Sequence, residues 1–66
     1  MKIGNVSKGD IVINSSKNEE TYGYMGLVVG SWFNKIENIP NLVVVMWKGN
    51  IISWYVGKEI MSIKKI

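Results

Sequence analysis

The side chains able to carry out acid–base or nucleophilic chemistry are few, and they lie apart along the sequence. The 66-residue chain has no cysteine and no histidine, so it lacks a thiolate nucleophile, an ordinary imidazole base and the commonest ligands of zinc, copper and iron. The carboxylates that remain are Asp10, Glu19, Glu20, Glu37 and Glu59. We therefore expect no metal site and no cofactor.

Two serine–lysine neighbours, Ser7-Lys8 and Ser16-Lys17, have the residue types of a serine nucleophile with a lysine base. Adjacency within a polar segment does not by itself place a base on a nucleophile. Glu19 and Glu20 point to opposite sides of an extended chain, and Asp10 beside Gly9 has the character of a turn residue. The sequence therefore predicts a protein that is not an enzyme and has no catalytic residues.

The lysines are the second group of side chains that could have a functional role, because cationic side chains bind phosphate groups. The chain has eight lysines, no arginine and a formal charge of +3, but the lysines are scattered. Ile, Lys and Asn make up 25 of the 66 residues, which an AT-rich gene explains without any polyanionic partner. Four lysines would gather at one end of the fold if the chain ends lie close together, and they are the candidate nucleic-acid contacts: Lys2, Lys8, Lys64 and Lys65.

The aromatic side chains are too many to be buried together in so small a core. They have three uses: a groove for an extended peptide, a platform for unpaired bases, or the centre of a subunit interface. We favour the interface, with another protein or a second copy of the chain as partner. The candidate partner-binding residues are Tyr22, Tyr24, Trp32, Phe33, Met46 and Tyr55.

The elements that must position these side chains are predicted to be strands. Of the 66 residues, 19 are Ile, Val or Thr, and the chain has seven glycines and no alanine. Gly26 and Gly30 mark points where the second strand bends or is closely approached. We expect one all-β domain over residues 1–66, with a 3₁₀ turn at 57–59 before the last strand. The expected strands are 11–13, 24–33, 42–47, 51–56 and 60–63.

The strongest local signal is a hairpin in which residues 42–47 and 51–56 flank Lys48-Gly49-Asn50. A two-residue turn at Gly49-Asn50 would place one wholly apolar set on the core face. That set is Val43, Val45, Trp47, Ile52, Trp54 and Val56. The opposite, mixed face would carry Val44, Met46, Lys48, Ile51, Ser53 and Tyr55.

Two motifs give the chain a family likeness. Gly9-Asp10-x-Val12 with Gly23-x-x-Gly26-x-Val28 resembles the KOW-type signature of small SH3-like barrels. The stretch 43–50 followed by Ser53-Trp54-Tyr55 resembles small SH3-like proteins encoded by tailed bacteriophages. The resemblance spans about residues 8–63 and implies a small five-stranded SH3-like barrel. The KOW likeness implies RNA or DNA binding, although the residues beside Gly23 and Gly26 here (Thr21, Tyr22, Tyr24 and Met25) are not basic.

These observations together predict a non-enzymatic SH3-like protein-interaction or structural module, of the kind that serves as a phage accessory protein, able to form a homo-oligomer. The alternative is a KOW-like RNA- or DNA-binding protein. The longest uncharged stretch, residues 21–34, has 14 residues and three glycines, short of the roughly 20 apolar residues of a membrane-spanning helix. We expect no membrane partner, and a location in the cytoplasm (of the host if phage-encoded) or in a virion.

Overall fold

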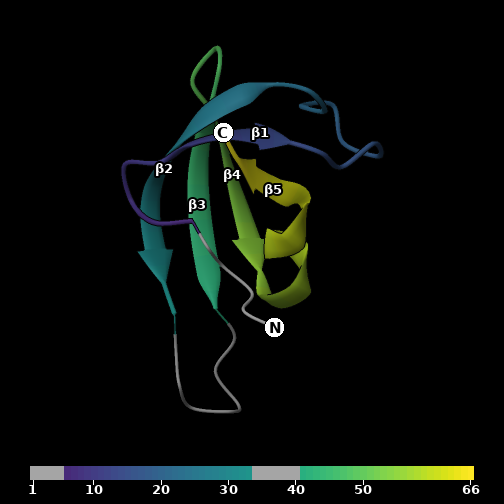
Figure 1. The fold of residues 1–66 in the computed structure, drawn as a ribbon. Coiled ribbons are helices and arrows are strands. Elements are labelled where there is room, and N and C mark those ends of the chain that lie inside the picture. Colours follow the sequence, from purple (N-terminus) through teal and green to yellow (C-terminus); the bar gives the residue numbers. More distant parts are fainter. Residues whose placement is uncertain (1–5, 34–40) are drawn as a thin grey trace.

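The computed structural model describes residues 6–33 and 41–66, which form a single curved antiparallel sheet (Figure 1). The sheet order is β4-β3-β2-β1-β5. One 3₁₀ helix, η1, lies between the last two strands. The predicted all-β fold, its five strands and the 3₁₀ turn before the last strand are therefore confirmed. The elements are β1 (Ile11–Asn14), β2 (Met25–Trp32), β3 (Leu42–Trp47), β4 (Ile51–Val56), η1 (Gly57–Ser62) and β5 (Ile63–Lys65).

The last strand begins later than the sequence predicts, because residues 60–62 continue η1 instead of starting β5. Glu59 holds this helix at both ends. Its side chain accepts the backbone N–H of Val56 at 3.0 Å, and its carbonyl accepts the Ser62 hydroxyl at 2.8 Å. The Ile63 N–H then bonds back to the Ile60 carbonyl, so extended structure starts only at Ile63.

The two glycines within β2 lie where other side chains come close to its backbone. A Cβ added at Gly26 would fall on the Trp47 ring and 2.9 Å from the Met46 carbonyl oxygen. A Cβ at Gly30 would fall 2.7 Å from Cζ3 of Trp32, whose ring therefore covers this part of the strand. The register of β2 on β3 also shifts between Val28 and Gly30, which marks a bulge. The expectation of close approach at these glycines is confirmed.

The core lies on one face of the sheet and is built mainly from β-branched and aromatic side chains. Val43, Val45 and Trp47 project into it from β3, as the sequence predicts. The Trp47 and Tyr55 rings meet edge to face, with centroids 6.2 Å apart. The buried apolar residues are Val6, Val12, Val28, Val43, Val45, Trp47, Tyr55, Ile60 and Ile63.

The predicted register of the β3–β4 hairpin is wrong by one residue. Trp47 pairs with Ile51, Val45 with Ser53 and Val43 with Tyr55. Three residues therefore form the loop, with Gly49 at φ 86° and Asn50 at φ 64°. Because side chains alternate along a strand, a slip of one residue moves every β4 side chain to the other face.

Trp54 shows the consequence most clearly, since the two-residue turn places it in the core and the structure leaves it 67% exposed. Ile52 and Val56, predicted on the same core face, are exposed as well. Tyr55 makes the opposite move and is buried, with 3% of its surface exposed. The outward side of the hairpin is consequently apolar and not mixed.

Candidate interaction surface

The β3–β4 register places three apolar pairs on the side of the sheet that faces away from the core: Leu42 with Val56, Val44 with Trp54, and Met46 with Ile52. The pairing continues outward from β3. Leu27 and Trp32 of β2 lie opposite Met46 and Leu42, and Ile11 of β1 lies opposite Leu27. We name these nine residues the outer apolar face: Ile11, Leu27, Trp32, Leu42, Val44, Met46, Ile52, Trp54 and Val56.

This face is large for a chain of 66 residues. Trp54 and Trp32, 67% and 55% exposed, contribute the most area, and Ile11, Ile52 and Val56 are also exposed. With full areas of about 150–250 Å² per large side chain, the five residues that are 41–67% exposed leave on the order of 400–650 Å² of surface in water, and the four half-buried residues add to this. The largest apolar patch on a typical monomer covers about 300–600 Å², and larger ones mark interaction sites. None of the nine residues carries a charge.

The predicted partner-binding residues do not form one group. Trp32 and Met46 belong to the outer apolar face, and Phe33 follows Trp32 at the end of β2, also exposed. Tyr22 and Tyr24 are exposed in the segment between β1 and β2. Tyr24 lines an open hollow of about 630 Å³ together with Gly23, Met25, Lys48, Gly49 and Ile51.

Tyr55 is no part of a surface, because its hydroxyl lies in a polar cluster under the loop that follows β1. It donates to Oε1 of Glu19 at 2.9 Å. The amide nitrogen of buried Asn14 donates to the same Glu19 oxygen at 3.0 Å and to Oγ1 of Thr21 at 2.7 Å. Burial first, and then the bond to Glu19, raise the pKa of the Tyr55 phenol above its ordinary value. The cluster ties the loop to β4 and leaves Tyr55 unavailable to a partner.

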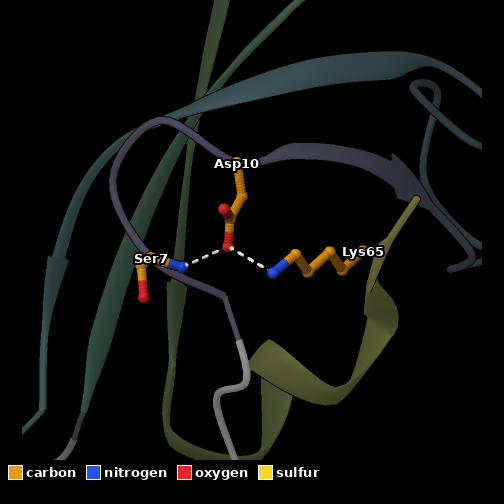
Figure 2. Close-up of polar contacts among 3 residues, drawn as sticks. All are labelled: Ser7, Asp10 and Lys65. Atoms are coloured by element: carbon orange, nitrogen blue, oxygen red, sulfur yellow. Dashed lines mark hydrogen bonds and ion pairs between the residues drawn. The ribbon is translucent and has the colours of Figure 1, made fainter.

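The candidate nucleic-acid lysines are brought together in part. β5 pairs with β1 and brings Lys65 to the first turn, which carries Lys8, whereas Lys64, opposite Ile13, projects on the other side of the strand. Figure 2 shows that the Asp10 carboxylate in this turn accepts the Ser7 N–H at 2.8 Å and lies 3.7 Å from the Lys65 ammonium group. Asp10 is therefore a turn residue, and its charge offsets that of Lys65. Lys2 lies outside the described residues.

Three residues of the outer apolar face were missed by the sequence reasoning, which placed Ile52, Trp54 and Val56 in the core. The length of the hairpin loop was the feature of the sequence that could have indicated the correct register. Lys48-Gly49-Asn50 also fits a three-residue hairpin connection, the next most common class after two-residue loops. The hydrophobic pattern favours the wrong register, because Ile52, Trp54 and Val56 are a more apolar set than Ile51, Ser53 and Tyr55.

Within the described residues, no group of three or more carboxylates is placed to hold a metal ion. No helix in this part of the chain is long and apolar enough to cross a membrane. No family model matches the chain, and neither the curated proteins nor the solved structures contain a match to it. The surface itself is therefore the basis for a functional proposal.

Proposed function

We propose that this protein is a non-enzymatic interaction module with an SH3-like barrel fold, of the kind that tailed bacteriophages encode as accessory or structural factors, and that its outer apolar face binds protein. The strand order β4-β3-β2-β1-β5, with a 3₁₀ helix before the last strand, supports the SH3-like part of the proposal. The observation that carries the binding role is the uncharged face on which Trp32 and Trp54 are both more than half exposed.

The chemistry of the face favours protein over other ligands. Trp and Met are enriched at the centres of protein interfaces, where charged residues are depleted. Trp54 projects from β4 and Trp32 from β2, on either side of Val44, so the two indoles can act as anchors of one contact region. A phosphate backbone would find no cation among the nine residues, since Lys64 on this side of the sheet lies on β5, at the edge away from β4.

The test compares binding by charge-substituted variants. Trp54→Lys places an ammonium group on the β4 strand of the outer apolar face, at its most exposed residue, whereas Met61→Lys makes the same change at a 50% exposed residue of η1. We expect protein complexes, whether with a second copy or with another protein captured from bacterial lysate, to be absent in Trp54→Lys and present in Met61→Lys. Circular dichroism should show that both variants keep the wild-type fold.

A third variant, Tyr22→Lys, examines the loop aromatics that the sequence also predicts to bind a partner. Loss of binding in Tyr22→Lys with full binding in Trp54→Lys would move the site from the outer apolar face to the loop between β1 and β2. Binding that survives both substitutions would contradict the proposed function.

The second candidate function is KOW-like nucleic-acid binding, and the observation in its favour is the placement of Lys8, Lys64 and Lys65 around one corner. It predicts RNA or DNA binding whose affinity falls steeply with salt and is weakened when these three lysines are changed to alanine. A gel-shift assay at low ionic strength that shows no complex would remove this candidate. The ion pair of Lys65 with Asp10 weakens the case already.

A further inference from the structure

We propose that the occupant of the outer apolar face is a second copy of this chain, and that two copies pack these faces against each other around a two-fold axis. This inference rests on the proposed function, because it names the partner of the same surface. Three properties of the described residues support it: the distribution of charge, the area available and the shape of the face.

The charge distribution permits two like-charged copies to meet. The chain carries a formal charge of +3, so two copies repel each other wherever their lysines would be juxtaposed. No lysine is among the nine residues, although Lys64, opposite Ile13, projects on the same side of the sheet from β5. β5 is the edge strand farthest from β4, so Lys64 lies at the rim of the face and away from Trp54. A contact centred on β3 and β4 therefore keeps the described lysines out of its middle.

The area is in the range that a specific dimer needs. Two such faces packed against each other would together bury on the order of 1,000 Å², the area that a biological interface should reach. The contact would also add to the small free energy of folding that the monomer has by itself. A core rarely stabilises a domain of this size by more than about 3–5 kcal/mol, and this chain has no disulfide to supplement it.

The shape of the face suits two-fold packing. Along one row of the sheet, Trp54 lies beside Val44 and Val44 beside Gly30, which the Trp32 ring covers, so the small Val44 lies between two indoles. In a two-fold contact each surface meets its own copy. Trp54 of either copy can then lie against Val44 of the other copy. Trp32, on β2, would border this contact on the side away from β4.

A different dimer, in which the free edges of the two β4 strands pair, is the main structural competitor. Gly57 donates to Asn41 across the β3–β4 ladder at 2.9 Å, so by alternation Tyr55 and Ser53 also bond to β3. The backbone groups of Ile52 and Trp54 then point to the free edge. The Val56 N–H, on the same edge, is already bound by the Glu59 side chain. Only Ile52 and Trp54 can offer both of their backbone groups there, and such pairing would leave the outer apolar face in water.

The experiment is sedimentation equilibrium on the full chain at about 100 μM, where a dimer with a micromolar Kd is well populated. We expect wild type and Met61→Lys to sediment at twice the 7.5 kDa chain mass. We expect Trp54→Lys and Ile52→Lys to sediment as monomers, with at least a tenfold weaker self-association. Circular dichroism and thermal melts verify that each variant is folded.

A mixed sample of isotope-labelled and unlabelled wild-type chains then locates the interface by NMR. Face-to-face packing predicts intermolecular NOEs from the Trp54 ring to the methyl groups of Val44 and Leu42. Intermolecular backbone NOEs between Ile52 and Trp54 would instead indicate β4 edge pairing and would overturn the inference.

The remaining outcomes separate this inference from the function on which it rests. A monomeric wild type that binds another protein, with Trp54→Lys abolishing that binding, would overturn the dimer and preserve the proposed function. A monomer that binds no protein would overturn both. A dimer that persists unchanged in Trp54→Lys and Ile52→Lys would show that the copies meet through another surface, and the dimer proposed here would be wrong.

Discussion

Asn14 is the residue on which the buried polar cluster depends. Its amide nitrogen has two N–H groups and faces three acceptors, of which Thr21 and Glu19 are nearer than the Tyr55 hydroxyl at 3.4 Å. Its carbonyl oxygen accepts the backbone N–H of Ser16 at 2.8 Å. One buried amide thus closes the turn after β1 and holds the loop against β4. Such a network is costly to break, because its remaining members stay buried.

Replacing Tyr55 by Phe tests the strength of this cluster. The ring stays in the core while Glu19 loses its bond from the hydroxyl, so we expect a loss of about 1 kcal/mol in the free energy of unfolding, measured in urea at neutral pH. Tyr24→Phe, at an exposed tyrosine, is the control and should change it by less than about 0.5 kcal/mol. An equal loss in both variants would contradict a specific role for the Tyr55 hydroxyl.

The same variant has a distinct pH dependence, because burial raises the pKa of Tyr55 above 10.0. Above pH 10 the unfolded chain ionises this phenol while the folded chain still holds its proton. The stabilising contribution is therefore complete below pH 10 and is lost as the pH rises through the folded-state pKa. We expect the stability difference between wild type and Tyr55→Phe to be constant below pH 10 and to shrink above it, in urea titrations repeated across this range.

The two glycines of β2 should respond differently to the same substitution. Gly26→Ala forces a methyl group onto the Trp47 ring and the Met46 carbonyl, neither of which can yield easily, so we expect a loss of about 1–3 kcal/mol. Gly30→Ala meets only the outer part of the exposed Trp32 ring, which can turn aside. Urea unfolding should therefore show a smaller loss for Gly30→Ala, accompanied by a shift in tryptophan fluorescence. Equal losses would mean that Trp32 is held as firmly as Trp47.

Among the elements, the β3–β4 hairpin decides which residues are available for binding. Its loop has two residues with positive φ, Gly49 and Asn50, and Asn50 is the only non-glycine with positive φ among the described residues. Asn tolerates this conformation better than most residues, because its short polar side chain can bond locally. The loop therefore stabilises the register that buries Tyr55 and exposes Trp54.

Substitutions at Asn50 should show this preference directly. Asn50→Gly removes the Cβ and should leave stability unchanged or slightly raised, whereas Asn50→Val puts a β-branched residue at φ 64°. We expect Asn50→Val to lose about 1–2 kcal/mol relative to Asn50→Gly in urea unfolding. If Val is tolerated as well as Gly, the loop must adopt a different conformation in solution.

For the whole molecule, the two faces of the sheet are both largely apolar, which is unusual for an antiparallel sheet that faces water on one side. The inner face builds the core around Trp47, and the outer face presents Trp32 and Trp54. The free edges differ too. β5 ends in Lys64 and Lys65, charges of the type that discourage further strand pairing, whereas β4 has none. Exposed apolar surface with no charged residue beside it is thus concentrated on the side of the molecule formed by β3 and β4.

A dimer formed through this side couples folding to association, so thermal stability should depend on protein concentration. We expect the Tm of wild type to rise by several degrees between about 5 and 500 μM in calorimetry, and the Tm of Trp54→Lys to stay constant. Met61→Lys should behave as wild type. A wild-type Tm independent of concentration would argue that folding does not require a second copy.

Local sequence patterns were enough to predict the all-β fold, four of the five strands to within one or two residues, the 3₁₀ turn before the last strand and the close approach at Gly26 and Gly30. These follow from local chemistry: β-branched runs, turn residues and glycines at fixed spacing. The partner-binding candidates Trp32 and Met46 followed from surplus aromatic and apolar content alone.

The tertiary structure decided which face of β4 is buried. Apolar burial alone would favour placing Ile52, Trp54 and Val56 inside, so the observed register depends on the loop conformation and on a polar partner for Tyr55. That partner, Glu19, lies 36 residues away in sequence, beyond the reach of any local pattern. Long-range hydrogen bonding therefore placed Tyr55 inside and Trp54 outside, and with them the candidate interaction surface.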